Sequence, residues 1–297
     1  MLTQSQNFLP LFPKIDINEY SQVHIIDIEN LVGDKPRRRN HQQRENYIRK
    51  VNTKLDQYMS EFRTPNSLFI ISLAKDFNGL KKYQYKTNKL KNIYSIPSCG
   101  ISGADNVLIT FLKDNFLVKT DSIQNRLKDI YLATGDKDFL QTSKSLNKKF
   151  SKLNLVLSEG SSFNKNLIQY CQRCIFLGTF DSNEQKLITF IKHYIYSAIG
   201  KFDEIKTLDL IEKINFTYVN KYEPGQKIIE SSKAGTKFKL YKNSKESDEY
   251  LNVVIELNKT PLKNNILDHQ SLLQDALMKV LSKEVKINFK KKLSVQV

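Results

Sequence analysis

The sequence predicts an α/β protein, a three-layer α/β/α sandwich around a mainly parallel sheet that is followed by a small α+β module. Short apolar runs alternate with stretches of helical period in the first part of the chain, a pattern typical of βαβ units. Near residue 180 this alternation stops, and helical stretches are followed by strand-like stretches. We therefore expect a first domain over residues 18–180 and a basic accessory module over residues 183–297.

In the first domain, an apolar run that starts at Val23 is typical of a strand buried on both faces of a parallel sheet. A long helix is expected over residues 42–62, because apolar side chains recur there at helical spacing until Pro65 and Asn66 break the pattern. Further strands are expected at residues 67–73, 92–97, 130–134 and 153–158, and helices at residues 80–91, around Asp105 and at residues 136–149.

In the accessory module the pattern favours a small α+β fold of winged-helix-like type. The basic tail at residues 279–292 is expected either to reach a phosphate backbone or to be a solvated end of the chain. Helices are expected at residues 184–199, 202–214 and 267–281, and strands at residues 237–241 and 250–257.

Composition is that of a folded protein without a membrane segment. Hydrophobic residues make up 40% of the 297 residues and charged residues 26%, which is ordinary for a globular chain. No apolar run approaches the roughly 18 residues that a bilayer-spanning helix needs. The N-terminus also lacks the basic flank and apolar core of a signal peptide. We expect a cytoplasmic protein.

The net charge favours a polyanionic partner. The chain has 47 lysines and arginines against 31 aspartates and glutamates, so the formal charge is +16. Such an excess of positive charge favours binding to nucleic acid, although it carries no information about nucleotide sequence.

The cysteines do not form a secreted disulfide framework, because the chain has three of them. Cys171 and Cys174 form a C-x-x-C pair without a second pair or a histidine close by in sequence. A structural zinc ion is one interpretation. The alternative that we favour is two small apolar side chains on one face of a helix.

Acidic side chains follow two of the predicted strands and open a helix beside a third. In an open α/β sheet, ligands gather outside the carboxyl ends of the strands, so carboxylates there are candidates for chemistry. The candidates are Asp27, Glu29 and Asn30 after the first strand, Asp105 in the first turn of a helix, and Asp136 and Asp138 after Gly135.

Each of these acids also has a purely structural interpretation. Asp27 can start a turn, and Asp136 can cap the helix that follows it. Asp105 and Asp138 can oppose the dipole of a helix from its first turn. The functional interpretation therefore depends on the joint occurrence of the acids at strand ends, and not on any one of them.

The order and spacing of these residues resembles the NYN family of PIN-like nucleases. Asp27 and Asn30 match an Asp and an Asn at the end of that family's first strand, and Asp105 matches its middle acid. The run Gly135–Phe139 matches the family's Gly-Asp-x-Asp-Phe signature. The resemblance covers about the first 160 residues and implies a metal-dependent ribonuclease on a PIN-like fold.

Clustered carboxylates repel one another unless a cation balances their charge, and hard oxygen ligands suit Mg²⁺ or Mn²⁺. With the resemblance, this leads us to expect Asp27, Asp105 and Asp136 as metal ligands. Asp138 would bind the metal directly or through water, and Asn30 would orient a water or the scissile phosphate.

The sequence departs from the family at one place. Many NYN proteins carry another acid within two helical turns after the middle Asp, where this chain has Thr110 and Phe111. Asp114 follows Asp105 at a spacing that turns it to the opposite side of a helix. A reduced ligand set leaves the number of metal ions open.

Basic residues beside the acids are the candidate phosphate contacts. The triplet Arg37, Arg38 and Arg39 follows the first strand, and guanidinium groups match phosphate geometry. Lys81, Lys82 and Lys137 are further candidates, although lysines on a helix are as often a solvated face.

Two functions remain in contention after these observations. The first is a metal-dependent endoribonuclease, and the second is a PIN-like protein that binds RNA through its basic surface without cutting it. A phosphatase of the HAD type is disfavoured, because the run from Asp27 to Leu31 lacks the second Asp and the Thr that such enzymes need. A role of residues 183–297 in self-association or in binding a protein partner is compatible with either.

Overall fold

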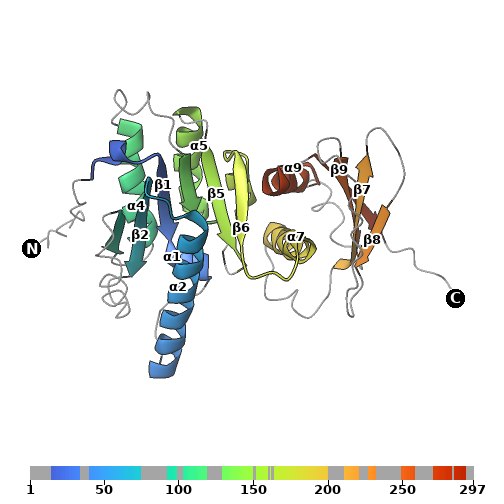
Figure 1. Cartoon of the computed structure of the whole chain (residues 1–297), viewed down its shortest axis with the longest axis horizontal. Helices are drawn as coiled ribbons and strands as arrows, with labels where there is room; N and C mark the ends of the chain where they lie inside the picture. The colour runs from blue at the N-terminus through green and yellow to red at the C-terminus, as the bar shows by residue number, and fades with distance from the viewer. Residues whose placement is uncertain are drawn as a thin grey trace, which may run out of the picture. The chain divides into compact units, whose positions relative to one another are not determined.

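A computed structural model (Figure 1) describes thirteen segments of the chain. By compactness the chain divides into two units, Met1–Gln172 and Arg173–Val297. The described segments are residues 15–33, 40–74, 92–98, 103–118, 129–149, 152–159, 161, 164–199, 211–220, 227–231, 249–257, 270–282 and 284–291.

A six-stranded parallel sheet confirms the predicted α/β class, with strands in the order β3-β2-β1-β4-β5-β6. Its central strands are buried apolar runs, as expected for a parallel sheet that is covered on both faces. The strands are β1 (Gln22–Asp27), β2 (Ser67–Ala74), β3 (Ile93–Ser98), β4 (Asp129–Ala133), β5 (Leu153–Ser158) and β6 (Arg173–Leu177).

Helical segments connect these strands, and the long helix expected over residues 42–62 is confirmed as α2 (His41–Phe62). The expected helix at residues 80–91 lies outside the described residues. The other helical segments are η1 (Ile17–Glu19), α1 (Ile28–Val32), α4 (Gly103–Leu112), the π-helical turn η2 (Lys113–Val118), η3 (Lys137–Phe139), α5 (Leu140–Lys149) and α6 (Lys165–Ile168).

An aromatic cluster around His24 packs α2 against one face of the sheet. The imidazole lies between the rings of Phe69 and Tyr131, which occupy the neighbouring register positions on β2 and β4, at centroid distances of 4.5 and 4.4 Å. From α2, the hydroxyl of Tyr58 lies 3.0 Å from Nδ1 of His24, and Phe62 packs on the same ring. The carboxyl-terminal half of α2 is therefore fixed over the first half of β1.

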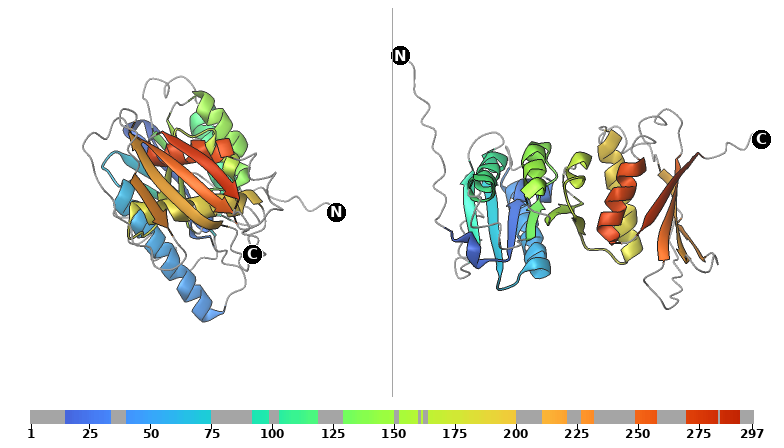
Figure 2. Two further views of the ribbon diagram at one scale, coloured as in Figure 1. Left: turned by 90° about the vertical axis from the view of Figure 1, so that its right-hand side faces the viewer. Right: turned by 90° about the horizontal axis from the view of Figure 1, so that it is seen from above.

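Helix α4 contacts β1, β2 and β3 through buried side chains that include Leu108 and Phe111. Helices α2 and α4 lie on opposite sides of the sheet (Figure 2, right). Because strand side chains alternate, Val23 and Ile25 face away from the His24 cluster. This arrangement is compatible with the three layers that the sequence predicts.

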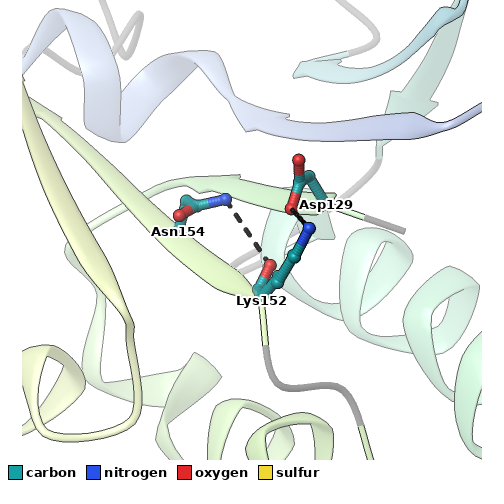
Figure 3. Close-up of polar contacts among 3 residues, drawn as sticks. All are labelled: Asp129, Lys152 and Asn154. Atoms are coloured by element: carbon teal, nitrogen blue, oxygen red, sulfur yellow. Dashed lines mark hydrogen bonds and ion pairs between the residues drawn. The ribbon is translucent and has the colours of Figure 1, made fainter. Parts of the chain in front are cut away.

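The amino ends of β4 and β5 carry polar contacts at the edge of the sheet opposite the acidic residues (Figure 3). Lys152 Nζ lies 3.9 Å from Asp129 Oδ1, and Asn154 Nδ2 donates to the carbonyl of Lys152 at 3.5 Å. Both charged side chains are partly exposed, 43% and 31%, so the ion pair contributes little to stability. We assign this edge no functional role.

The second unit contains a four-stranded mixed sheet in the order β10-β9-β7-β8. The pair β9–β10 is parallel and is connected through α9, whereas β7 pairs antiparallel with both of its neighbours. The elements are α7 (Asn183–Ile199), β7 (Ile211–Asn220), β8 (Lys227–Ser231), β9 (Glu249–Leu257), α9 (Gln270–Leu281) and β10 (Val285–Lys291).

Several expectations for this unit need correction. The helix expected over residues 202–214 is wrong in its last part, because β7 begins at Ile211. The basic stretch at residues 279–292 is not simply a chain end, since β10 pairs with β9 and buries Val285 and Ile287. Its alternating apolar residues give it a strand's period, which the lysines obscure. The winged-helix-like arrangement is not confirmed, and the strand expected at residues 237–241 lies outside the described residues.

The two cysteines of the C-x-x-C pair are buried free thiols, but they do not share a helix face as expected. Cys171 follows α6, where its thiol donates to the carbonyl of Leu167, whereas Cys174 lies in β6. Separately, none of the helices within the described residues is both long enough and apolar enough to cross a bilayer.

The buried imidazole of His24 predicts acid sensitivity of the fold. Burial lowers the pKa of His24 to about 3 from 6.5, so below pH 6.5 the unfolded chain binds a proton that the folded chain does not. The contribution of His24 to stability is therefore fully present above pH 6.5 and is lost as the pH falls toward 3. In denaturant titrations, His24→Phe should reduce the slope of unfolding free energy against pH in this window by up to about 1.4 kcal/mol per pH unit. An unchanged slope would contradict the assignment.

Candidate active site

The candidate site lies where the strand order reverses, between β1 and β4. From β1 the chain continues to β2 on one side of the sheet, whereas from β4 it continues to β5 on the other. At such a point the connections diverge and leave a crevice at the carboxyl ends of the strands, where ligands of open α/β sheets bind. Asp27 is the last residue of β1, and Asp136 follows shortly after the end of β4.

Asp27 is 3% exposed and is held by hydrogen bonds to both of its carboxyl oxygens. As the N-cap of α1, it accepts at Oδ1 from the backbone N–H of Asn30 at 3.2 Å. Its Oδ2 accepts from the hydroxyl of Thr134 at 3.2 Å. Helix α1 ends after a single turn at Gly33, whose φ of 72° is the left-handed conformation that glycine adopts readily. The orientation of Asp27 is thus fixed by elements on both sides of it.

Asp105, in the first turn of α4, hydrogen bonds side chain to side chain with Asp27. Burial, followed by the charge of Asp105, raises the pKa of Asp27 to about 8. Burial also raises the pKa of Asp105 to about 6, although the hydrogen bond with Asp27 acts in the opposite direction. The two carboxyls therefore share a proton near neutral pH, with Asp27 as the donor.

The loop after β4 brings Asp136 and Asp138 to the same site. Asp136 is the N-cap of η3 and accepts at Oδ1 from the backbone N–H of Asp138 at 3.0 Å. The charges of both residues, together with that of Glu29, raise the pKa of Asp105. Asp136 is half-buried and Asp138 is exposed. These two carboxylates thus form the outer part of the acidic site.

Two residues that sequence reasoning did not assign to the site connect its halves. Thr134 donates to Asp27 and accepts at Oγ1 from the backbone N–H of Asp136 at 3.1 Å. The backbone N–H of Gly135 donates to Oδ1 of Asn30 at 2.8 Å. The position of Thr134 between a buried strand and Gly-Asp is a signal that could have marked it as a site residue. Its partner Asp27 is distant in sequence, so the contact could not be predicted.

The structure therefore brings together Asp27, Asp105 and the Asp136–Asp138 segment, as the sequence predicts, while Asn30 has a different contact. Its amide oxygen accepts from the backbone of Gly135 and so helps to position the loop after β4. Among the expected phosphate contacts, Lys137 is exposed in η3, next to the acids. Arg37, Arg38, Arg39, Lys81 and Lys82 lie outside the described residues.

The oxygen donors of Asp27 and Asp105, the inner pair of the site, fit a divalent cation. A complete ligand set is not preformed among the described residues. Among the described residues, no three Asp, Glu, His or Cys side chains are arranged to hold a metal ion. Mg²⁺ commonly binds through one or two carboxylates and keeps several waters. Asp27 and Asp105 offer such a pair, and their shared proton shows that uncompensated negative charge is costly there.

Comparisons of the chain with profiles of known protein families, with curated proteins and with solved structures found no match.

The buried carboxyl pair predicts that Asp27→Asn makes the stability of the metal-free protein less dependent on pH. Because the pKa of Asp27 is raised from 3.8 to about 8, the carboxyl contributes most to stability below pH 3.8 and less as the pH rises toward 8. An amide has no such dependence, but its nitrogen cannot accept from the Thr134 hydroxyl as a carboxyl oxygen does, which lowers the stability of the variant equally at every pH. In thermal unfolding with EDTA, the unfolding free energy of the variant minus that of wild type should therefore rise by at least about 1 kcal/mol from pH 5 to pH 8. Asp114→Asn, at an exposed position after α4, is the matched control. A difference that does not change with pH would contradict the shared proton.

The contact between Asn30 and Gly135 predicts a structural cost for Asn30→Ala. The truncation leaves the N–H of Gly135 in a buried position without its acceptor, which should lower the unfolding free energy by about 1–2 kcal/mol. Denaturant unfolding measures this cost. Asn46→Ala, at an exposed position in α2, should change stability by less than about 0.5 kcal/mol. Equal effects of the two substitutions on the unfolding free energy would show that the contact between Asn30 and Gly135 does not contribute to stability.

Proposed function

We propose that the protein is a metal-dependent endoribonuclease whose first domain is PIN-like. The observation that carries this proposal is the hydrogen-bonded pair of Asp27 and Asp105 at the strand-order reversal, with the charges of Asp136 and Asp138 acting on it. These are the acids that the resemblance to the NYN family selects. Their closeness supports a common role, which their separate capping positions alone do not explain.

In this proposal Asp27 and Asp105 hold Mg²⁺ or Mn²⁺ directly, and Asp136 and Asp138 hold its waters or complete its ligand set. The cation, when bound, polarises a phosphoryl oxygen and makes a bound water more acidic. Thr134 positions Asp27 and the backbone of Asp136 relative to one another through its hydroxyl. Asn30 positions the loop after β4 through its contact with Gly135. Asp27 and Asp105 would release their shared proton when they hold the cation.

The chemistry favours a phosphodiester substrate. A +16 chain attracts polyanions, while an acidic site within it attracts a cation that can also contact substrate phosphate. In-line attack of water on phosphorus breaks the bond to the 3′ oxygen and leaves a 5′-phosphate and a 3′-hydroxyl. The choice of RNA over DNA comes from the resemblance to the NYN family.

The second candidate function is binding of RNA without cleavage on the same scaffold. Two observations favour it: the described residues preform no three-carboxylate metal group, and Thr110 and Phe111 stand where many NYN proteins have a further acid. Under this alternative the Asp27–Asp105 pair is a structural contact between β1 and α4. The two functions differ in whether divalent cations enable strand cleavage.

Cleavage assays with matched variants distinguish the two functions. Labelled RNA and DNA of the same sequence are incubated with Mn²⁺, Mg²⁺ or EDTA and with wild type, Asp105→Asn, Asp136→Asn or Asp114→Asn. Loss of a carboxylate that acts on the metal should reduce the rate at least about 10²-fold. Asp114→Asn should cut as wild type does, because this residue is exposed on the segment after α4.

Each outcome decides between the candidates. Metal-dependent cleavage that is lost in Asp105→Asn and Asp136→Asn supports the nuclease. RNA binding by wild type without cleavage in either metal supports the alternative. Equal cleavage by all four proteins would show that a contaminating enzyme, and not this site, produces the activity.

A further inference from the structure

Helix α2 is longer than the sheet that it covers. Tyr58 and Phe62 pack on His24 in the first half of β1, and Ser67 at the start of β2 donates to Gln22 at the start of β1. The carboxyl end of α2 therefore lies at the amino edge of the sheet. Since α2 returns the chain to that edge, its amino end extends in the direction of the carboxyl edge, where the acidic site lies.

The first six residues of α2, His41–Asn46, form what we call the α2 overhang. All six are exposed, and the first buried residue of the helix is Tyr47. At 1.5 Å per residue they add about 9 Å of helix. In two perpendicular views, one end of the blue helix α2 projects beyond the strands (Figures 1 and 2, left). Asn40 and Gln43 form a reciprocal capping box that stabilises this end without packing on the sheet.

Arg44 is the residue of the overhang that continues the packing face of α2. It precedes Val51 by seven residues, which places it about 20° from Val51 around the helix axis. Val51, Leu55 and Tyr58 are buried on this face, whereas Arg44 is exposed. A charged side chain occupies the position at which the apolar stripe would otherwise continue. Its guanidinium therefore lies on the side of α2 that faces the body of the domain, past the last buried turn.

The position of the α2 overhang relative to the acidic site is inferred from the contacts of α1. Asp27 caps α1, and α1 contacts α2. Asp105 belongs to α4, on the opposite side of the sheet from α2. Since a helix is on the order of 10 Å wide, we assign Arg44 to a phosphate beside the scissile one and not to the scissile phosphate itself.

We propose that the α2 overhang is a binding arm for the RNA backbone, in which Arg44 contacts a phosphate flanking the one that is cleaved. This inference rests on the proposed function, because the acidic site defines which edge the RNA crosses. Charge complementarity supports RNA as the occupant, since residues 41–50 contain three exposed cationic residues, Arg44, Arg49 and Lys50, and one acidic residue, Glu45. Guanidinium is suited to phosphate by its paired N–H donors.

The test compares two exposed arginines at opposite ends of one helix. Arg44→Ala and Arg44→Lys probe the overhang, and Arg63→Ala, at the C-cap of α2, is the matched control at the amino edge. Binding to single-stranded RNA is measured in EDTA over a range of salt concentrations. Arg44→Ala should bind about 5-fold more weakly, with a salt slope lower by roughly 0.7, while Arg44→Lys keeps most of the affinity and Arg63→Ala equals wild type.

Substrate length and single-turnover rates locate the contact. A dinucleoside monophosphate, which carries a single phosphate, should bind equally to wild type and Arg44→Ala, because it has no flanking phosphate. At saturating enzyme with Mn²⁺, the cleavage rate of Arg44→Ala should match that of wild type. Equal RNA affinities of the Arg44 and Arg63 variants would overturn the arm, as would absence of RNA binding by wild type. Binding that depends on Arg44 without any cleavage would instead reject the nuclease and retain the arm.

Discussion

The arrangement of the site depends on one electrostatic constraint, a buried carboxyl that cannot easily ionise. Asp27 ends the central strand β1, is 3% exposed and faces a second carboxyl from α4. Two such groups cannot both be charged at low cost in a buried position. They are kept together by the Thr134 hydroxyl, by the capping bond to Asn30 and by the packing of α4 on β1 and β2. Either a shared proton or a cation balances the pair.

The structural and functional interpretations of the acids are not alternatives in this fold. Asp27 and Asp136 are N-caps, and Asp105 and Asp138 lie in first turns, as local reasoning expects. Each helix start is nevertheless placed at one edge of a parallel sheet, so the capping carboxylates converge. A carboxylate that caps a helix uses one of its two oxygen atoms for the cap, so the second oxygen can take part in another contact. Convergence of helix starts at one edge can thus produce an acidic site from residues with ordinary local functions.

Charge is distributed in space in a way that composition does not reveal. The chain is strongly basic, yet its most buried titratable groups near the sheet edge are acids. Of the exposed basic residues of α2, Arg44 lies before Tyr47, the first buried residue of the helix, and Arg49 and Lys50 lie between Tyr47 and Val51. If the protein is the nuclease that we propose, its basic surface would attract the polyanion, and a cation at the acidic site would remove the repulsion between the carboxylates and the substrate phosphate.

Local patterns were enough to predict most elements of the first domain and the acids of its site. The spacing of Tyr47, Val51, Leu55 and Tyr58 predicts α2, and apolar runs predict β1, β2 and β5, because period and burial are local properties. The polar residues at the ends of the first and fourth strands predict Asp27 and Asp136 as site residues, because the end of an apolar run is also a local property. The helix expected over residues 202–214 failed, because strand pairing of Ile211 and its neighbours with β9 outweighed local helical spacing.

The contacts among these residues follow from the tertiary structure. Neighbours in the chain are enough to place carboxylates at several strand and helix ends, since capping and burial are local properties. They do not determine that β1 lies beside β4, that Thr134 bonds to Asp27, or that Asn30 accepts from Gly135. These contacts join residues more than a hundred positions apart. Strand order and side-chain hydrogen bonds across such distances follow from packing of the whole sheet, which no local pattern encodes.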